Sequence, residues 1–387
     1  MSLVTDLSKS IAVPTVLIIG LRPCYVDQTN RMTRLIIDTL RGHGYGVRSV
    51  NMFSAANRDG RRRRRVSPAY KVVSGLRKWR HVLSAIRRHD VIQFDFDLAK
   101  SSVVSALILL AASGFFGKRS VLAVSSVSNE AVTGLRGLIM RRILRTPNAI
   151  VAGSDAAARY LRRFSANVNM IPQTACAHES AIRRGNGLQP RVGLVAPIDP
   201  TVFGSVVRSL TLVKQKYPRA ELVIMANCRQ AGEIQTHRAH SSLNGVDVAA
   251  CNRERQVVQA LSTCDVYLET SSQVDPPSAL IEALVLGMPV VSTDTAGTAN
   301  SIKHGVTGLV VAAGNHVDLA NRLCELVETP ELARTLSAGA LALARQYDRS
   351  TVSVAWAQLY AMVSPARQVT PDWSSQLSPQ YQATVKA

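Results

Sequence analysis

A single carboxylate, Glu282, interrupts an otherwise apolar helical stretch, ALIEALVLG, at a position where the helical period would accept another leucine. Gly287 ends this stretch, and an expected buried strand then leads into a small-residue turn that contains Gly297. Backbone N–H groups at such a turn can bind phosphates, and a carboxylate can accept hydrogen bonds from hydroxyls. The spacing therefore predicts a site for a ligand that carries both groups, such as a nucleotide. The alternative is an ordinary α/β unit in which Glu282 faces water.

The elements around this segment follow a regular alternation of strand and helix patterns. Strands are expected in the first half at 15–20, 46–53, 90–97, 119–126, 148–154 and 167–173, and in the second half at 191–197, 221–227, 246–251, 265–271, 289–293 and 308–314. Helical patterns fall between most of them, which predicts an α/β protein with two doubly wound, Rossmann-like parallel sheets. Because ligands of such sheets bind at the carboxyl ends of the strands, we expect two domains that face each other across a ligand-binding cleft.

The net charge of +20 lies entirely in the first half of the chain. Residues 1–190 contain 30 Lys and Arg against 10 Asp and Glu, whereas residues 191–387 contain 16 of each. At 387 residues two domains are expected, and the stretch RRGNGL is typical of a linker. We therefore predict a strongly basic N-terminal domain at 1–185, a C-terminal domain at 189–347, a helix at 348–363 that packs back toward the N-terminal domain, and a disordered tail at 364–387.

The composition favours a cytoplasmic protein without a structural metal or a membrane span. The six cysteines are scattered and show no CxxC or Cys/His spacing, which indicates a reducing compartment. The apolar run at 13–20 is too short for a signal peptide and is expected to be the first strand. The uncharged run at 101–117 is interrupted by Ser and Gly, so we expect a buried helix there rather than a transmembrane one.

A longer pattern around Glu282 is that of a known family. PPSALIEALVLGMPVVSTDTAGTANSIKHGVTGLVV, with DVYLETSS before it and YPRAELVIMAN further upstream, resembles the carboxyl-terminal domain of GT-B glycosyltransferases of the family-4 type, the glycosyl transferases group 1. In the first half, NAIVAGSDAAARYLRRF resembles the segment that leads to the interdomain linker of that family. The resemblance covers roughly residues 14–362 and implies a GT-B fold, a nucleotide-sugar donor and no cofactor.

The resemblance also implies roles for individual residues. In this family the second Glu of a Glu-x7-Glu pair binds the ribose of the donor, and that position is Glu282 here. The first position is Val274, and Asp275 follows it as a candidate catalytic residue that would contact sugar or acceptor hydroxyls. Ser278, Ala279 and Leu280 would offer backbone N–H groups to the diphosphate at the start of a helix, with Gly297 also in the donor site.

The chain departs from the family where positive charge is expected. An Arg and a Lys usually follow the first strand of the C-terminal domain, where this chain has Pro197 and Val202 or Phe203. This departure matters because negative charge grows on the leaving diphosphate in the transition state. Two other cations are candidates for stabilising that charge. They are Arg22, in the turn after the first strand, and Lys303, after the Gly297 turn. Each of them can equally be a solvated surface cation.

Asp97 is the candidate catalytic residue of the first half. It ends an expected strand, so its carboxylate should face the cleft and contact acceptor hydroxyls. The tripeptide Asp95-Phe96-Asp97 also matches the DxD metal signature of the other large glycosyltransferase fold. Matches of three residues arise by chance often, and the two-domain alternation argues against that fold. We therefore expect no metal.

Five consecutive arginines, Arg61, Arg62, Arg63, Arg64 and Arg65, precede a helical pattern at 71–88 that has one apolar face and is otherwise basic. A polybasic loop beside an amphipathic helix predicts peripheral binding to the anionic inner face of the cytoplasmic membrane. The alternative is that the apolar face packs on the sheet and the arginines are solvated. Nucleic acid is a less favoured partner, because no aromatic residues interleave the run.

These observations lead to one main hypothesis and two alternatives. The main one is a retaining, metal-independent glycosyltransferase that moves a sugar from a nucleotide-sugar donor to a lipid-linked or saccharide acceptor in envelope polysaccharide biosynthesis. Such catalysis depends on positioning and on stabilisation of the leaving diphosphate. The first alternative is a GT-B-fold binding protein, or a subunit of a polysaccharide-synthesis complex, that has lost transfer activity. The second is a sugar-phosphate epimerase or phosphorylase on the same fold.

Overall fold

The computed structural model describes residues 13–20, 27–51, 79–97, 102–124, 134–175, 190–195, 200–228, 230–232, 234, 245–270, 276–294 and 302–364. Several predicted site residues lie outside these ranges: Arg22, the run from Arg61 to Arg65, Asp275 and Gly297. Most of the predicted tail, from residue 365 onward, also lies outside them.

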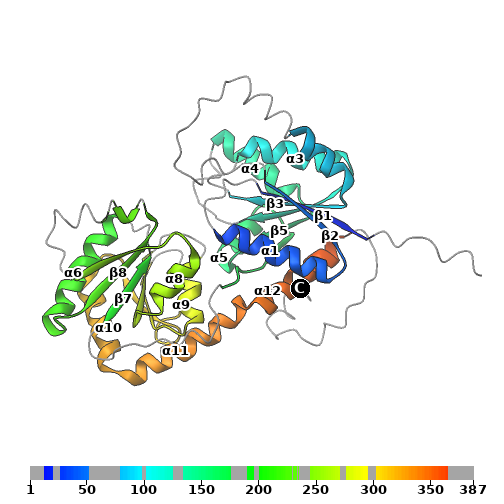
Figure 1. Ribbon diagram of the computed structural model, residues 1–387. Coiled ribbons are helices and arrows are strands. Elements are labelled where there is room, and N and C mark those ends of the chain that lie inside the picture. Colours follow the sequence, from blue (N-terminus) through cyan, green and yellow to red (C-terminus); the bar gives the residue numbers. More distant parts are fainter. Residues whose placement is uncertain are drawn as a thin grey trace, which may run out of the picture.

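The first half of the chain forms a six-stranded parallel sheet in the order β2-β1-β3-β4-β5-β6 (Figure 1). Its strands are β1 Thr15–Gly20, β2 Gly46–Asn51, β3 Val91–Phe96, β4 Arg119–Val124, β5 Ala149–Ala152 and β6 Val168–Met170. The chain runs from β1 to β2 and then crosses to β3 on the other side of β1. The gap between β1 and β3 is therefore a topological switch point, where ligands of open parallel sheets bind.

Helices cover both faces of this sheet, and successive strand residues point into two different cores. The helices are α1 Asp27–Gly42, α3 Val103–Phe115, α4 Gly134–Arg145, α5 Asp155–Arg162 and, from the far end of the chain, α12 Arg349–Val363. Val16 and Ile18 of β1 pack with Trp356 of α12, whereas Leu17 and Ile19 pack in the core on the other face. We call this sheet and its helices the first lobe.

The second half forms another six-stranded parallel sheet, in the order β12-β11-β10-β7-β8-β9. Its strands are β7 Arg191–Val195, β8 Glu221–Ala226, β9 Val246–Ala250, β10 Val266–Glu269, β11 Val290–Asp294 and β12 Leu309–Ala312. Its helices are α6 Pro200–Lys216, α8 Glu254–Leu261, α9 Ser278–Val285, α10 His316–Glu328 and α11 Pro330–Ala344. We call this unit the second lobe; its switch point lies between β7 and β10.

The predicted α/β class with two doubly wound parallel sheets is confirmed. After α11 and a 3-10 turn at Arg345–Tyr347, the chain leaves the second lobe as α12 and lies along the first lobe (Figure 1). There Trp356 and Tyr360 pack in the same cluster as Ile36 of α1, and Arg349 pairs with Asp38 of α1 at 3.1 Å. The last helix therefore ties the second lobe to the outer face of the first.

Helix α3 differs from the buried helix that the sequence predicted for 101–117. Its inner face, with Leu109 and Leu110, is buried, but Val104, Ile108 and Phe115 on the outer face are exposed. The uncharged run thus forms a helix that packs on the sheet through one of its faces and exposes the other. No helix within the described residues is long and apolar enough to cross a membrane.

Candidate functional site

A contact between the lobes centres on the carboxylate of Glu282, which is only 2% exposed. Arg31 of α1 donates from Nη1 to Glu282 Oε1 at 3.2 Å. The same guanidinium donates from Nη2 to Glu254 Oε1 of α8 at 3.3 Å. One cation from the first lobe thus pairs with two carboxylates of the second, and the local charge of the three side chains is −1.

The position of Glu282 follows from how α9 is built and held. Pro277 is the N-cap residue, and every residue from Ala279 to Val285 is buried. Gly287 ends the helix at a φ of +62°, a left-handed conformation that favours glycine, and Leu341 of α11 packs directly against it. Because α9 is packed on all sides, Glu282 projects at a fixed place about one helical turn from the N-terminus of α9.

The N-terminus of α9 offers backbone donors near this carboxylate. The Leu280 N–H already donates to the Pro277 carbonyl at 3.0 Å. Among the described residues, the Ser278 and Ala279 N–H groups donate to no carbonyl. Unpaired N–H groups and the positive end of a helix dipole favour an anion. These two N–H groups are therefore the better candidates for a phosphate.

A second buried carboxylate, Glu269, lies at the carboxyl end of β10 beside the switch point of the second lobe. It accepts a hydrogen bond from the Tyr267 hydroxyl at 2.8 Å. Burial, and then the neighbouring Glu269 carboxylate, hold the pKa of Tyr267 well above its ordinary value. Tyr267 therefore stays protonated as the donor, and it orients Glu269 within the sheet.

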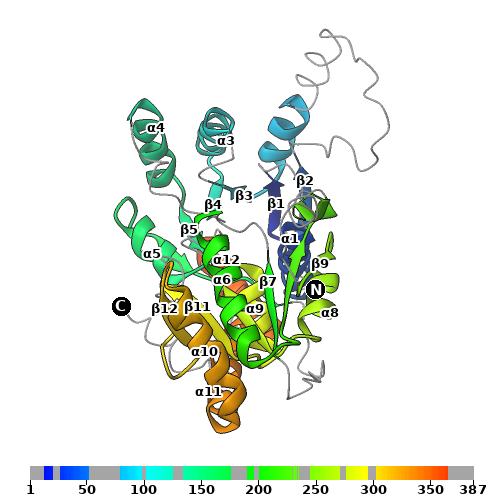
Figure 2. The same ribbon diagram turned by 90° about the vertical axis from the view of Figure 1, so that its left-hand side faces the viewer.

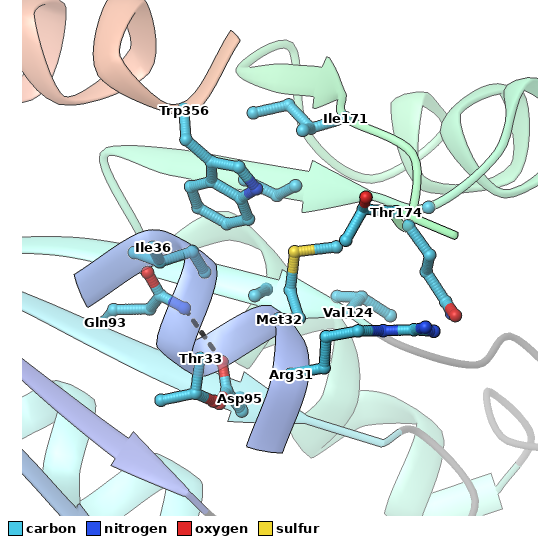
Figure 3. Close-up of a pocket in the computed structure, with 14 residues that line it drawn as sticks. Arg31, Met32, Thr33, Ile36, Gln93, Asp95, Val124, Ile171, Thr174 and Trp356 are labelled. Atoms are coloured by element: carbon cyan, nitrogen blue, oxygen red, sulfur yellow. Dashed lines mark hydrogen bonds between the residues drawn. The ribbon is translucent and has the colours of Figure 1, made fainter. Parts of the chain in front are cut away.

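A cavity of about 100 Å³ lies on the first lobe at the carboxyl ends of its strands (Figure 3). Its lining comes from α1, from the ends of β3, β4 and β5, from residues 171–174 and from α12. Arg31 belongs to this lining as well as to the contact with Glu282. The cavity therefore adjoins the contact between the lobes.

The comparisons with known proteins agree with this geometry. The profile of the family described as glycosyl transferases group 1 matches residues 190–329, which contain the whole second sheet and Glu282. The chain contains a group 1 glycosyltransferase domain. The predicted resemblance is thereby confirmed, and α9 with its buried glutamate lies inside the glycosyltransferase domain.

Two curated glycosyltransferases are similar to parts of the chain. One is the N,N'-diacetylbacillosaminyl-diphospho-undecaprenol alpha-1,3-N-acetylgalactosaminyltransferase of Campylobacter jejuni, 27% identical over 31% of this chain and 32% of the relative. The other is the D-inositol 3-phosphate glycosyltransferase of Thermobispora bispora, 30% identical over 21% of this chain and 19% of the relative. The matched segments span about a third of the first relative and a fifth of the second.

Solved glycosyltransferase structures share the architecture of both lobes. Sucrose-phosphate synthase from Thermosynechococcus elongatus superposes with a TM-score of 0.68 and 15% identity, over 90% of this chain and 98% of that chain. Alr3699/HepE from Anabaena, in complex with UDP, superposes with a TM-score of 0.66 and 14% identity, over 90% and 100% of the two chains. At this identity the likeness establishes the GT-B fold.

The structure separates the predicted donor-site residues of the glycosyltransferase domain. Glu282 and the N–H groups of Ser278 and Ala279 lie together on α9. Lys303 is exposed in a turn that ends near Gly308, and Gly308 lies close to Ile302 and to Val290 at the start of β11. That turn is at the amino-terminal edge of the sheet, opposite the strand ends. Its location gives no support to a role for Lys303 with the diphosphate.

In the first lobe, the structure brings Asp95 rather than Asp97 to the cavity. Asp97 follows β3, is buried, and does not belong to the cavity lining. Asp95 accepts from Gln93 Nε2 at 2.9 Å and from Thr33 Oγ1 at 3.5 Å. The described residues hold no cluster of three His, Cys, Asp or Glu side chains suited to a metal ion. Metal independence stays a prediction.

Three residues of this site were missed by the sequence reasoning: Arg31, Glu254 and Trp356. Arg31 is separated from Glu282 by 251 positions, and no local pattern marks either partner of such a pair. Glu254 is the first residue of α8 and has the ordinary signature of a helix start. Trp356 lies in the helix predicted at 348–363, and that prediction did not give the neighbours of its side chain.

Proposed function

We propose that this protein is a retaining, metal-independent glycosyltransferase that moves a sugar from a nucleotide-sugar donor to a lipid-linked or saccharide acceptor in envelope glycan synthesis. One observation carries the proposal. The buried carboxylate of Glu282 lies about one turn from the N-terminus of α9, at the contact between two lobes of GT-B architecture. A carboxylate there can accept from ribose hydroxyls while backbone N–H groups one turn away bind the diphosphate.

Catalysis by this arrangement would be positioning with electrostatic stabilisation. Ser278 and Ala279 would hold the diphosphate by their N–H groups, and the positive end of α9 would stabilise the charge that grows on it. Arg31 would add a cation from the first lobe. A phosphate oxygen of the donor would accept the proton of the attacking hydroxyl, so that the protein needs no strong base. Asp275 and Asp97 remain the proposed contacts to sugar and acceptor hydroxyls.

The names of similar proteins support the proposed substrate classes. The HepE structures hold UDP, UDP-glucose, or UDP with glucose. The Campylobacter relative is named for transfer to a diphospho-undecaprenol sugar, a lipid-linked acceptor. UDP is therefore the first nucleotide to test.

The proposal is tested by binding of UDP, GDP and ADP to the wild-type protein and to Glu282→Gln, measured by thermal shift. A nucleotide at 100 times its Kd should add about 2.7 kcal/mol to the free energy of unfolding. We expect at least one nucleotide to stabilise the wild-type protein and Glu282→Gln to lose most of that gain. The matched control is Glu331→Gln, which changes an exposed carboxylate of α11. This variant should keep the full stabilisation by the nucleotide. A wild-type protein that none of the three stabilises would contradict the proposal.

A second candidate, a GT-B-fold binding protein without transfer activity, is favoured by the ion pair at Glu282. The carboxylate that would bind ribose is already paired with Arg31. Turnover separates the two candidates: a transferase releases UDP from UDP-sugars when an acceptor is added, whereas a binding protein retains them unchanged.

A further inference from the structure

Among the residues that the structure describes, a buried hydrogen-bond donor at the cavity of the first lobe has no partner. Trp356 of α12 is 2% exposed, and its Nε1–H has no hydrogen-bond partner among the described residues. The nitrogen-bearing edge of the ring faces the Met32 side chain (Figure 3), and Nε1 itself has almost no accessible surface, so a ligand reaches this N–H only after the Met32 side chain shifts. Buried polar groups of native proteins are nearly always paired, so an orphaned donor at a cavity wall indicates a bound group that completes it.

Neighbouring side chains hold this donor in place. Trp356 packs against Tyr360 with ring centroids 6.2 Å apart, and the Tyr360 hydroxyl donates to Gln93 Oε1. Tyr360 is fully buried, so this bond fixes α12 against strand β3 of the first sheet. The indole N–H therefore keeps one direction, and binding a ligand would cost little conformational entropy of the Trp356 side chain.

A carboxylate and an apolar wall complete the cavity. Gln93 uses its oxygen for Tyr360, so its Nε2 donates to Asp95 Oδ1, and Thr33 donates to the other carboxylate oxygen. These donors orient Asp95, and a carboxylate can accept from further N–H or O–H groups. Met32, Ile36 and Ile171 provide the apolar part of the lining. The cavity thus offers an indole donor, a carboxylate acceptor and an apolar surface to a ligand.

We infer that this cavity binds the acetamido group of an N-acetylated acceptor sugar. The acetamido carbonyl would accept from Trp356 Nε1–H, its N–H would donate to Asp95, and its methyl group would contact Met32 and Ile36. This assignment rests on the proposed function, since it names the acceptor of that transfer.

The size of the cavity fits a substituent rather than a whole sugar. An engineered apolar cavity of about 150 Å³ accommodates benzene, so about 100 Å³ takes an acetamido group with its four non-hydrogen atoms but not a pyranose ring. The ring would lie outside, toward Arg31, where the cavity adjoins the contact with Glu282. A sugar with a hydroxyl in place of the acetamido group would leave the apolar wall uncovered and would reach fewer of the polar partners.

The indole N–H itself provides the test. The chain has three Trp residues, and the indole signal that disappears from the ¹⁵N NMR spectrum of Trp356→Phe is that of Trp356. On addition of N-acetylglucosamine or N-acetylgalactosamine this signal should shift, whereas glucose and glucosamine should leave it in place. Equal shifts with glucose, or no shift with any sugar, would overturn the inference.

Substitutions give an independent measurement by isothermal titration with N-acetylglucosamine. Trp356→Phe keeps the ring and removes the N–H, and should weaken binding about tenfold. Asp95→Asn should also weaken binding about tenfold, while Trp79→Phe, at a partly buried residue packed against the core of the same lobe, should have no effect. Unchanged affinity in both cavity variants would contradict the assignment. If UDP binds but the acetamido sugars do not, only this inference fails; if the sugars bind but no nucleotide does, the proposed donor site fails.

Discussion

At the scale of single residues, the site depends on charges that come from opposite ends of the chain. Arg31 and Glu282 are 251 positions apart, yet their side chains meet at 3.2 Å. The sequence lacks the two cations that the family usually places after β7 to stabilise the diphosphate. Arg31 instead brings a cation from the first lobe to the Glu282 carboxylate. Glu282 itself could be predicted, because a carboxylate in an apolar helix stands out against its neighbours. Its partner could not, because an arginine on a surface helix is ordinary.

Arg31 is predicted to act on the diphosphate rather than on the nucleoside. Arg31→Ala should weaken binding of UDP by about tenfold to a hundredfold, because hydrogen bonds to a charged group contribute about 1.5–3 kcal/mol each. Binding of uridine should not weaken, and Arg31→Lys should recover part of the affinity for UDP. Calorimetric titration of the three proteins with both ligands measures this, with Arg34→Ala, an exposed arginine of the same helix, as the control. Tighter binding of both ligands to Arg31→Ala would contradict the prediction. It would mean that Arg31 competes with the ribose of the donor for the Glu282 carboxylate.

At the scale of elements, most strands and helices followed from the sequence. The strand predicted at 289–293 is β11 at Val290–Asp294, and the strand predicted at 221–227 is β8 at Glu221–Ala226. Strands of parallel sheets are buried on both faces and are therefore continuous apolar runs, which are easy to find. The packing of α12 against Met32 and Gln93 could not be predicted from the sequence, because an amphipathic pattern gives the buried face of a helix but not the residues that this face contacts.

Helix α11 supports α9 and is predicted to tolerate no side chain at Gly339. A Cβ there would lie 1.9 Å from the carbonyl oxygen of Val306, a backbone atom that cannot move away without shifting the turn at 303–308. Gly339→Ala should lower the free energy of unfolding by about 1–3 kcal/mol or more through overpacking. The matched control is Gly114→Ala in α3, where the new Cβ meets no atom within 4 Å.

The control should raise the free energy of unfolding by about 0.5–1 kcal/mol, since alanine favours a helix more than glycine does. Urea denaturation of both variants measures the difference. A Gly339→Ala protein as stable as the wild type would show that α11 is not packed on the turn as described.

At the scale of the whole molecule, the charge imbalance of the sequence corresponds to the division into two lobes. Helices α3 and α4 lie side by side at one end of the first lobe (Figure 2). The outer face of α3 exposes Val104, Ile108 and Phe115, the last of them 85% exposed. On α4, the exposed side chains of Leu138, Arg141, Arg142 and Arg145 share one helical face. Apolar side chains flanked by arginines are typical of a surface that binds anionic lipid.

This α3–α4 face is proposed as the membrane contact that brings the site to a lipid-linked acceptor. Ile108→Ser with Phe115→Ser should lower binding to vesicles that contain anionic lipid by at least tenfold, because burying one such side chain contributes about 1.5–3 kcal/mol. Replacing Arg141 and Arg142 by Gln should weaken binding mainly at low salt, at about 1 kcal/mol per arginine. Val317→Ser, on an exposed position of α10 in the second lobe, is the matched control. Flotation of the four proteins with neutral and anionic vesicles measures this, and equal recovery of the wild-type protein with both would rule the membrane contact out.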